Sequence, residues 1–312
     1  MMFLPPEGEE IVLPFSRVAI IGMGLIGSSL ARAVRQAMPT VRLTVSDGDA
    51  AVRERVVALD LADDVTENAG AAVVDAELVI LAVPVGAMGA IAAEIAAELA
   101  PGAIVSDVGS VKEKVLIDLV AALPGVIVIP AHPVAGTEKS GPDAGVASLF
   151  KDRWCILTPP ADTEAWQITR LGDFWRLLGA KVETMDAAHH DRVLAVTSHL
   201  PHLIAYSIVG TASDLETVTR GEVIKYSAGG FRDFTRIAAS DPVMWRDVFL
   251  NNREAVLETL GRFTEDLVAL QRAIRWGEGE TLEALFTRTR AIRRSIIDEG
   301  QDTEEPDFGR KH

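Results

Sequence analysis

The first part of the chain alternates short apolar runs with longer segments of helical character. The apolar runs are 18–21, 43–46, 78–83, 103–107, 126–129 and 154–158. Several are continuously apolar, as expected for strands that helices cover on both faces. Ala-rich segments such as 26–38 and 88–99 lie between them and predict helices. The alternation predicts an α/β domain with a parallel sheet over residues 17–185.

After about residue 185 the pattern changes to long helices without further strands. Between Val256 and Ile274 apolar residues recur every three or four positions, which predicts one apolar face of a helix. A shorter helix is expected over 281–297. We therefore predict an all-helical domain at 186–297, whose apolar faces are more than it can cover alone. A loose lead-in is expected at 1–16 and a polar, disordered tail at 298–312.

Composition narrows the class of protein. The chain has 312 residues, and its 45 acidic against 30 basic residues give a net charge of −15. This charge disfavours nucleic acid, because proteins bind it mainly by neutralising phosphates, and it disfavours anionic membrane surfaces. The single cysteine, Cys155, cannot form an internal disulfide, and we read it as buried and inert. No secretory signal or bilayer-spanning apolar run is evident, so we expect a soluble cytoplasmic protein.

A glycine motif follows the first predicted strand, in the sequence RVAIIGMGLIGSSLARA. Gly22, Gly24 and Gly27 form G-x-G-x-x-G between a strand and a helix. The first glycine permits a tight turn, the second lets a pyrophosphate approach the backbone, and the third lets helix and strand pack closely. The phosphates would lie at the helix N-terminus. We predict a Rossmann-type dinucleotide site here, which includes Leu25 and Ile26.

An acid ends the second predicted strand. Asp47 lies about 20 residues after Gly27, where a carboxylate accepts hydrogen bonds from the adenosine ribose and repels a 2′-phosphate. This position favours NAD over NADP. Asp47 could instead be an ordinary turn residue, and Asp49 is the nearest competing acid. Val83 and Pro84 are expected to flank the cofactor, unless the proline only terminates its strand.

Polar groups follow two further strands. His132 comes after the run at 126–129, and Ser110 comes after the run at 103–107. Ligands of open α/β sheets bind beyond the carboxyl ends of strands, so both side chains could face a nicotinamide. A neutral imidazole could accept a proton from a hydroxyl as hydride leaves the same carbon. The alternatives are a structural histidine and, for Ser110, a capping box with Glu113.

Five segments resemble the prephenate and arogenate dehydrogenases of tyrosine biosynthesis. They are GMGLIGSSLA, SDVGSVK, HPVAGTEKSG, SHLPH and GGFRDFTRIAASDPVMWRD, and they occur in this order. The third and the last are far more specific than a glycine motif. The resemblance implies that NAD takes a hydride from a ring carbon while a ring carboxylate leaves as carbon dioxide. It also implies that the helical domain forms a homodimer. Aromatisation supplies the driving force, so the protein mainly aligns and polarises the substrate.

The same resemblance implies roles for individual residues. His132 would bind the ring hydroxyl and assist its deprotonation, and Ser110 would orient both groups. Arg236 would hold a substrate carboxylate with its planar guanidinium, and His202 would lie near the substrate side chain. Arg232, four residues before Arg236 and so on the same helix face, would add positive charge, sometimes from the partner subunit.

Several weaker candidates remain. Thr137, with Glu138 and Lys139, would line or gate the pocket, although a plain surface loop explains them as well. Gly229 would allow close backbone approach to the substrate, or would simply form a turn, and the two arginines could be solvated surface charges. Three further histidines are read as structural: His189, His190 and His199. No carboxylate completes a metal-ligand spacing with the histidines, so no metal is expected.

Two other functions stay open. A β-hydroxyacid dehydrogenase on a similar plan would need a catalytic lysine on the helix beginning near His189, and the chain has none from there through Tyr206. A redox sensor that binds a dinucleotide without chemistry would not need His132, Ser110 and Arg236 together. The choice between prephenate and arogenate is left undecided.

Overall fold

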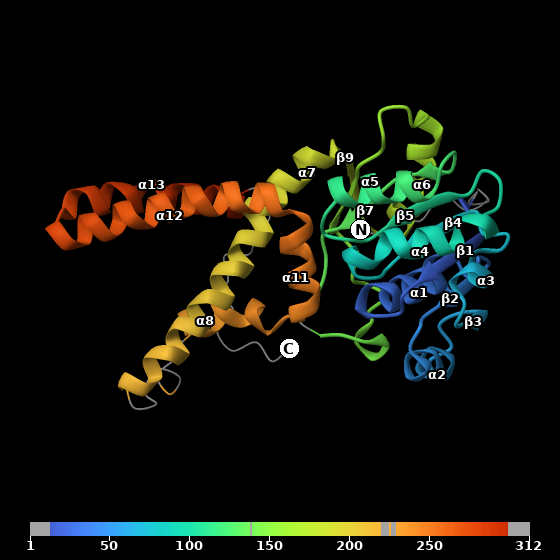
Figure 1. Ribbon diagram of the computed structural model, residues 1–312, viewed down its shortest axis with the longest axis horizontal. Helices are drawn as coiled ribbons and strands as arrows, with labels where there is room; N and C mark the ends of the chain where they lie inside the picture. The colour runs from blue at the N-terminus through green and yellow to red at the C-terminus, as the bar shows by residue number, and fades with distance from the viewer. Residues whose placement is uncertain (1–12, 138, 220–224, 226–228, 299–312) are drawn as a thin grey trace. The chain divides into compact units, whose positions relative to one another are not determined.

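The computed structural model describes residues 13–137, 139–219, 225 and 229–298, which fall into two compact units (Figure 1). Unit 1 comprises Met1–His199 and Ala239–Arg253, and unit 2 comprises Leu200–Ala238 and Glu254–His312. The first unit thus extends beyond the boundary expected at residue 185 and takes in a later segment. Most of the expected lead-in and tail, together with Glu138, lies outside the described residues.

Unit 1 is built on a parallel sheet with the strand order β3-β2-β1-β4-β5-β6. The strands are β1 (Arg17–Ile21), β2 (Arg42–Ser46), β3 (Asp64–Thr66), β4 (Leu78–Leu81), β5 (Ile104–Asp107) and β6 (Ile127–Val128). Val18 of β1 pairs with Leu43 on one side and Leu78 on the other. The central strands β4 and β5 are buried throughout, as their apolar sequences predict. Strand β3 is not predicted from the sequence, because a three-residue strand reading Asp-Val-Thr has no apolar signature.

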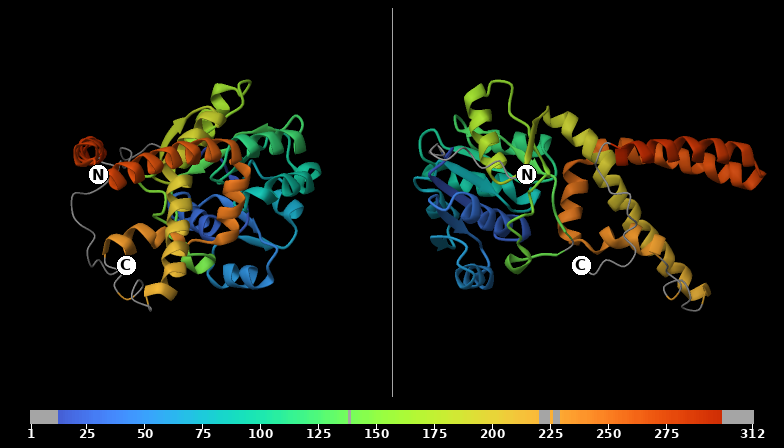
Figure 2. Two further views of the ribbon diagram at one scale, coloured as in Figure 1. Left: turned by 60° about the vertical axis from the view of Figure 1, so that its left-hand side comes forward. Right: turned by 180° about the vertical axis from the view of Figure 1, so that it is seen from behind.

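Helices flank this sheet (Figures 1 and 2). They are α1 (Leu25–Ala37), α2 (Ala50–Ala58), α3 (Ala69–Val73), α4 (Met88–Ile95) and α5 (Glu113–Ala122), with short 3-10 turns at Val85–Ala87 and Ala96–Glu98. Helix α1 buries Leu30 and Val34 in the core. Asp49 begins α2 by accepting a hydrogen bond from the Ala51 amide, 2.8 Å away. Asp49 is therefore a helix cap.

A second sheet carries His132. It consists of β7 (Ala131–Pro133), β8 (Trp154–Leu157) and β9 (Lys181–Thr184), with β7 antiparallel to β8 and β8 parallel to β9. His132 follows β6 of the main sheet, as expected, but it lies within a further short strand, β7, where it pairs with Ile156 of β8. Pro130 separates β6 from β7, and its missing N–H prevents one continuous ladder. Cys155 is buried in β8, as predicted.

Three more helices complete unit 1. Helix α6 (Ala165–Leu177) begins with a capping box between Glu164 and Gln167, and α7 (Ala187–Leu194) runs into a π-helix at Ala195–His199. Helix α11 (Pro242–Asn251) comes from far along the chain and packs against the turn at Val85–Ala87. Its N-cap is Asp241, which accepts from the Met244 amide.

The described part of unit 2 is helical. It contains α8 (Leu200–Thr219), α10 (Gly229–Thr235), a 3-10 turn at Arg236–Ala239, α12 (Arg253–Trp276) and α13 (Gly279–Asp298). Helices α12 and α13 lie side by side and reverse direction at Gly277, whose φ is 68° (Figures 1 and 2). Arg232 lies on α10 and Arg236 begins the 3-10 turn that continues it, so their shared helix face stays a prediction.

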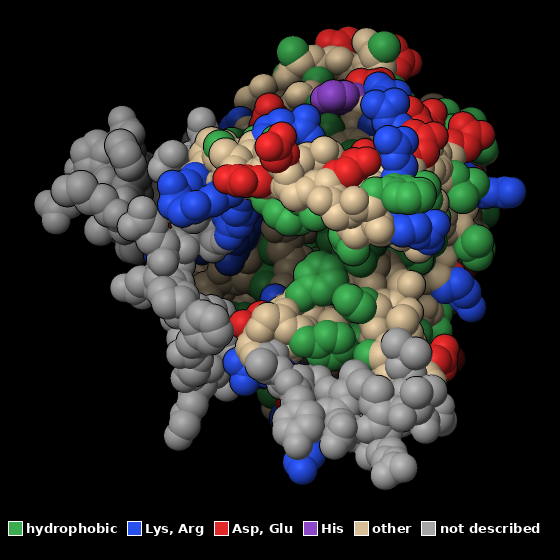
Figure 3. Space-filling model, turned by 90° about the vertical axis from the view of Figure 1, so that its left-hand side faces the viewer, with side chains coloured by type: hydrophobic (Ala, Val, Ile, Leu, Met, Phe, Trp, Pro, Cys, Tyr) green, Lys and Arg blue, Asp and Glu red, His purple; other side chains and the backbone are tan. Residues whose placement is uncertain are grey.

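Large apolar side chains remain exposed on α12 and α13. They are Leu257, Leu267, Val268, Ile274, Trp276, Phe286 and Ile292. On the face drawn in Figure 3, hydrophobic side chains lie between groups of Lys, Arg, Asp and Glu side chains. Exposed apolar surface of this extent is typical of an interaction surface.

One continuous helical stretch of the described residues, Ala187–Asp214, is long and apolar enough to cross a bilayer, which differs from the expectation that no such run is present. This is a statement of length and composition alone. Core helices of soluble proteins meet the same criterion.

Candidate active site

A pocket of about 290 Å³ lies in unit 1, where β1, β4 and β5 end. Its walls come from the glycine loop, from the segments after β4 and β5, from β7 with the loop that follows it, and from the start of α11. The lining includes these predicted site residues: Gly24, Leu25, Ile26, Val83, Pro84, Ser110, His132 and Thr137. The fold therefore brings the predicted cofactor and catalytic residues of unit 1 together at the carboxyl edge of the sheet.

The glycine loop has the geometry that a dinucleotide requires. Gly22 has a φ of 95°, and a Cβ there would lie 2.4 Å from the Ala82 carbonyl oxygen. A Cβ at Gly27 would lie 1.9 Å from the Gly22 oxygen, so neither position accepts a side chain. Space within 4 Å of a Cβ at Gly24 is open, and Gly24 is the N-cap of α1 without a side-chain hydrogen bond. Phosphate oxygens can therefore approach the backbone at this helix start.

Asp47 is fixed beside this loop. Its Oδ2 accepts from the Met23 amide at 2.8 Å, and its Oδ1 accepts from the Asp49 amide at 2.9 Å. Of the two acids considered from the sequence, Asp47 contacts the glycine loop, while Asp49 caps α2. The residues present fit a dinucleotide with a free ribose, and the ribose contact itself stays a prediction.

His132 is the end of a chain of three hydrogen-bonded side chains. It is 7% exposed, and its Nδ1 lies 2.8 Å from Nε2 of His190, whose Nδ1 lies 2.8 Å from Oδ1 of Asp191. A carboxylate only accepts, so the His190 Nδ1–H donates to Asp191. His190 Nε2 then accepts from the His132 Nδ1–H. This tautomer leaves a lone pair on Nε2 of His132, as a general base needs.

Burial keeps both imidazoles neutral. It lowers the pKa of His132 well below the usual 6.5, and the neighbouring His190 and Lys112 lower it further. Burial also lowers the pKa of His190, against the opposing effect of Asp191. His190, expected to be structural, lies directly against His132. His190 and Asp191 are adjacent in the chain, and that pairing was the available signal.

A buried ion pair lies behind His132. Lys112 and Asp107 are fully buried, and the Lys112 ammonium contacts the Asp107 carboxylate. Lys112 Nζ also donates to the Ala131 oxygen at 2.7 Å, while Asp107 Oδ1 accepts from the Ala131 amide at 3.2 Å. Burial raises the pKa of Asp107 and lowers that of Lys112. Both backbone groups of the residue before His132 are thus held by this pair, which the sequence analysis does not identify.

The Asp191 side chain, from α7, also caps the start of α5. Its two carboxylate oxygens accept from the Lys112 amide at 2.8 Å and the Glu113 amide at 3.0 Å. The alternative reading of Ser110 as a capping-box residue is therefore wrong, because the N-cap of α5 is Lys112 and a carboxylate from α7 takes the free amides. Ser110 lines the pocket instead.

The other predicted residues fall elsewhere. His199 is buried, and its Nδ1 lies 3.0 Å from the side-chain Nδ2 of Asn252. His189 is exposed on α7. Four candidates belong to unit 2: His202 on α8, Gly229 and Arg232 on α10, and Arg236 at the start of the 3-10 turn. Within the described ranges, no group of three or more His, Cys, Asp or Glu residues could hold a metal ion.

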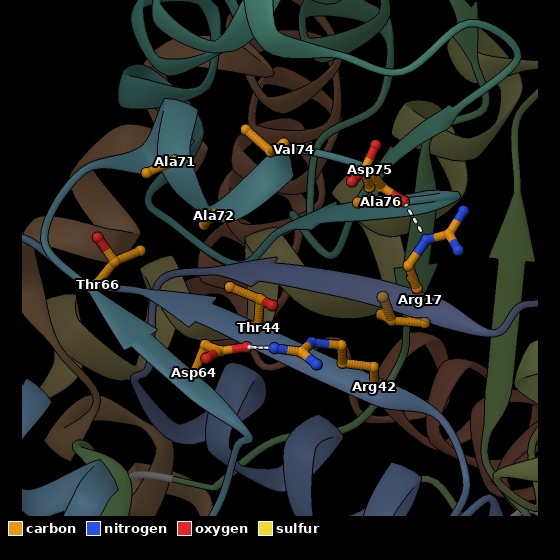
Figure 4. Close-up of a pocket in the computed structure, with 11 residues that line it drawn as sticks. Arg17, Arg42, Thr44, Asp64, Thr66, Ala71, Ala72, Val74, Asp75 and Ala76 are labelled. Atoms are coloured by element: carbon orange, nitrogen blue, oxygen red, sulfur yellow. Dashed lines mark hydrogen bonds and ion pairs between the residues drawn. The ribbon is translucent and has the colours of Figure 1, made fainter.

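Figure 4 shows a larger cavity, of about 530 Å³, at the start of β1 and β2 beside α3. Arg42 pairs there with Asp64 at 2.8 Å, and Arg17 Nε donates to the Asp75 oxygen at 2.5 Å. None of the predicted site residues lines it. Its charged groups serve local pairing, so the smaller pocket is the candidate active site.

Known proteins match the chain along most of its length. The family model "Prephenate dehydrogenase, nucleotide-binding domain" matches residues 30–184, and "Prephenate dehydrogenase, dimerization domain" matches 186–288. Cyclohexadienyl dehydrogenase of Zymomonas mobilis is 46% identical over 282 residues, which cover 90% of this chain and 96% of the relative. Prephenate dehydrogenase of Bacillus subtilis is 33% identical over 271 residues, covering 86% and 72%.

A solved structure agrees with these matches. Prephenate dehydrogenase from Aquifex aeolicus, in complex with hydroxyphenyl propionate and NAD+, superimposes with a TM-score of 0.84 at 33% identity, over 90% of this chain and 98% of that one. The predicted α/β domain followed by a helical domain is confirmed. The chain belongs to the prephenate dehydrogenase family, as its motifs predict.

Proposed function

We propose that the protein catalyses the NAD-dependent oxidative decarboxylation of prephenate, arogenate or both. The products would be 4-hydroxyphenylpyruvate or tyrosine, with carbon dioxide. The observation that carries the proposal is the Nε2 lone pair of His132, presented to a pocket whose other wall is the glycine loop. When bound there, NAD accepts the hydride. Family membership and the NAD complex of the Aquifex relative support this assignment.

His132 supplies the proton chemistry. As hydride leaves the hydroxyl-bearing carbon, the hydroxyl proton passes to Nε2 of His132. The imidazolium that forms is buried, which is unfavourable unless a negative charge lies close. The Asp191 carboxylate, acting through His190, provides that charge. Ser110 lines the same pocket and is proposed to orient the hydroxyl.

The carboxylates of the substrate need positively charged partners, and the described pocket walls contain few. Among the described lining residues, Lys139 is the one cation, and Asp241 opposes it. A doubly anionic substrate therefore calls for a further positive group in a protein of net charge −15. From the family resemblance we propose Arg236 for a substrate carboxylate. The same resemblance suggests supporting roles for three others: Arg232, His202 and Gly229.

The proposal extends to cofactor choice, assembly and location. The carboxylate of Asp47 favours NAD over NADP. The match to a dimerisation domain and the exposed apolar residues of α12 and α13 favour a homodimer. We propose a soluble cytoplasmic protein, in which the stretch Ala187–Asp214 belongs to the folded domains and not to a membrane. Its first turns hold His190 and Asp191, both buried and hydrogen-bonded within unit 1.

The deciding experiment follows NADH formation by the purified protein with prephenate or arogenate, using NAD and then NADP. Turnover with NAD on either substrate supports the proposal, and the ratio of the kcat/KM values names the preferred substrate. Tight NADH binding without turnover would favour a redox sensor. Turnover of a β-hydroxyacid would favour a β-hydroxyacid dehydrogenase. The 3-hydroxyisobutyrate dehydrogenase of Mycobacterium tuberculosis, at 16% identity, shares only the fold with this chain.

A further inference from the structure

A short segment links the substrate side of the pocket to the cofactor side. Residues Gly141–Val146, which we call the strap, follow the pocket-lining residues Thr137, Lys139 and Ser140 along the chain. The strap contains the 3-10 turn η3 (Pro142–Ala144). It packs against α1 and α2, the two helices that begin at the predicted phosphate and ribose sites.

The contact with α1 is buried and close. The Val146 amide donates to the hydroxyl of Ser29, a fully buried residue, at 3.0 Å. A Cβ on Gly145 would lie 2.5 Å from Oγ of Ser28. The same Ser28 hydroxyl donates to the Gly24 oxygen at 2.6 Å. The strap therefore rests on the helix turn that carries the second glycine of the cofactor loop.

The contact with α2 is an ion pair of favourable geometry. Arg55 Nε lies 2.8 and 3.0 Å from the two carboxylate oxygens of Asp143, and Nη2 lies 2.6 Å from Oδ1. Two residues earlier on α2, Arg53 donates to the carbonyl oxygens of Asp47 and Gly48 at 2.9 and 3.0 Å. One helix thus fixes both the predicted ribose loop and the strap.

We infer that Arg55 and Asp143 are positioning residues. Their ion pair fixes the positions of Thr137, Lys139 and Ser140 relative to the bound cofactor. The inference rests on the proposed function of the pocket. The strap contacts both α1 and α2, the helices at the predicted cofactor site. The pocket is therefore complete only when the strap keeps both contacts. The side chains of Arg55 and Asp143 are 47% and 62% exposed, so we expect a modest effect that salt weakens.

The test compares substrate KM across matched variants. Asp143→Asn and Arg55→Gln should each raise the KM for prephenate or arogenate about two- to fivefold, with kcat and the KM for NAD unchanged. Charge reversal, Arg55→Asp combined with Asp143→Arg, should restore the wild-type KM. Asp64→Asn is the control, because it breaks another exposed pair, Arg42–Asp64, in the cavity of Figure 4. The increase should shrink between about 0.1 M and about 1 M salt.

A second readout does not need turnover. Hydrogen exchange at the amides of Thr137, Lys139 and Ser140 should be faster in Asp143→Asn than in the wild type or in Asp64→Asn. Unchanged exchange, or a KM that rises equally for NAD and for substrate, overturns the inference. If Asp143→Asn shows faster exchange but the wild-type protein turns over neither substrate, the strap keeps its role and the proposed function is rejected.

Discussion

The two units treat their polar and apolar groups in opposite ways. In unit 1, His132, His190, Asp191, Lys112 and Asp107 are all buried and hydrogen-bonded to one another or to the backbone beside them. In unit 2, the described residues of α12 include two that are buried, Val256 and Ala273, while large apolar side chains face outward.

This difference separates two kinds of contribution. Buried polar groups are expensive unless all are paired, so the network in unit 1 fixes one geometry and one tautomer at His132. Unit 2 leaves apolar surface to be covered, which suits assembly, and it carries Arg232 and Arg236, which we propose as substrate-binding residues. Chemistry and recognition are thus proposed to reside in different units, and mutations should separate them.

The largest effect is expected at His132. His132→Asn removes the proton acceptor and should lower kcat by about 10²- to 10⁴-fold, with a modest change in substrate KM. Stopped-flow measurement of NADH formation checks this. Circular dichroism and NAD titration serve as controls for folding and cofactor binding. Retention of most of kcat would place the base elsewhere.

Arg236 should behave in the opposite way. The ring carboxylate loses its charge in the transition state, so a group that holds it contributes to binding more than to rate. Arg236→Ala should raise the substrate KM about tenfold to a hundredfold and lower kcat much less. Arg262→Ala, at an exposed arginine of α12, is the control for a simple loss of charge. Equal losses in both parameters for His132 and Arg236 would remove the division between the units.

Asp191 should show an intermediate effect. Asp191→Asn weakens the orientation of His190 and should lower kcat about 10- to 100-fold, by analogy with the carboxylates that orient metal-binding histidines. It should also lower stability by about 1 kcal/mol, because one of the two α5 amides loses its acceptor. Asp186→Asn is the matched control: it alters the N-cap of α7, 3.0 Å from the His189 amide, without touching His132. If both variants lose stability equally and neither loses kcat, the hydrogen-bond chain has no catalytic role.

The sequence predicts the fold where a strong periodic or apolar signal exists. Five strands of the main sheet, the glycine loop and the apolar face on α12 are each specified by local pattern. Strands β3, β7 and β9 are missed, because three or four residues with mixed polarity carry no period to detect. His132 lines the pocket after β6, but the short strand β7 of the second sheet, which holds it, has no signal in the sequence.

The network behind His132 could not be predicted in the same way. The contacts of Asp191 with Lys112 and Glu113 join residues almost 80 positions apart. A buried lysine also contradicts the ordinary expectation that lysine is solvated. Only the folded arrangement of α5, α7 and β7 shows that the carboxylate next to His190 orients one side chain and caps a helix.

The exposed apolar face of unit 2 should be sensitive to a charge. Phe286→Glu on α13 should weaken a homodimer and shift the protein toward monomer in sedimentation velocity, because burying an unpaired carboxylate in an interface is costly. Ile117→Glu changes an equally exposed apolar residue on α5 of unit 1 and should leave assembly unchanged. A dimer that tolerates Phe286→Glu and dissociates with Ile117→Glu would reverse the roles of the two units.

The smallest effect on activity concerns pH, which tests the protonation state of His132. His132 and His190 have depressed pKa values in the folded protein, chiefly through burial, so below about pH 6.5 the unfolded chain binds more protons than the folded one. Their contribution to stability is therefore fully present above about pH 6.5 and is lost as pH falls, by at most about 1.4 kcal/mol per pH unit for each group. Urea unfolding across this range should show the slope, and His132→Asn should reduce it, whereas His189→Asn at an exposed position should not.

The groups facing His132, namely His190, Lys112 and His199, all disfavour its protonation. For the same reason kcat/KM should stay high below pH 6.5. An acid limb centred near 6.5 would mean that His132 titrates as if in water, and the buried chain to Asp191 would then not set its protonation state.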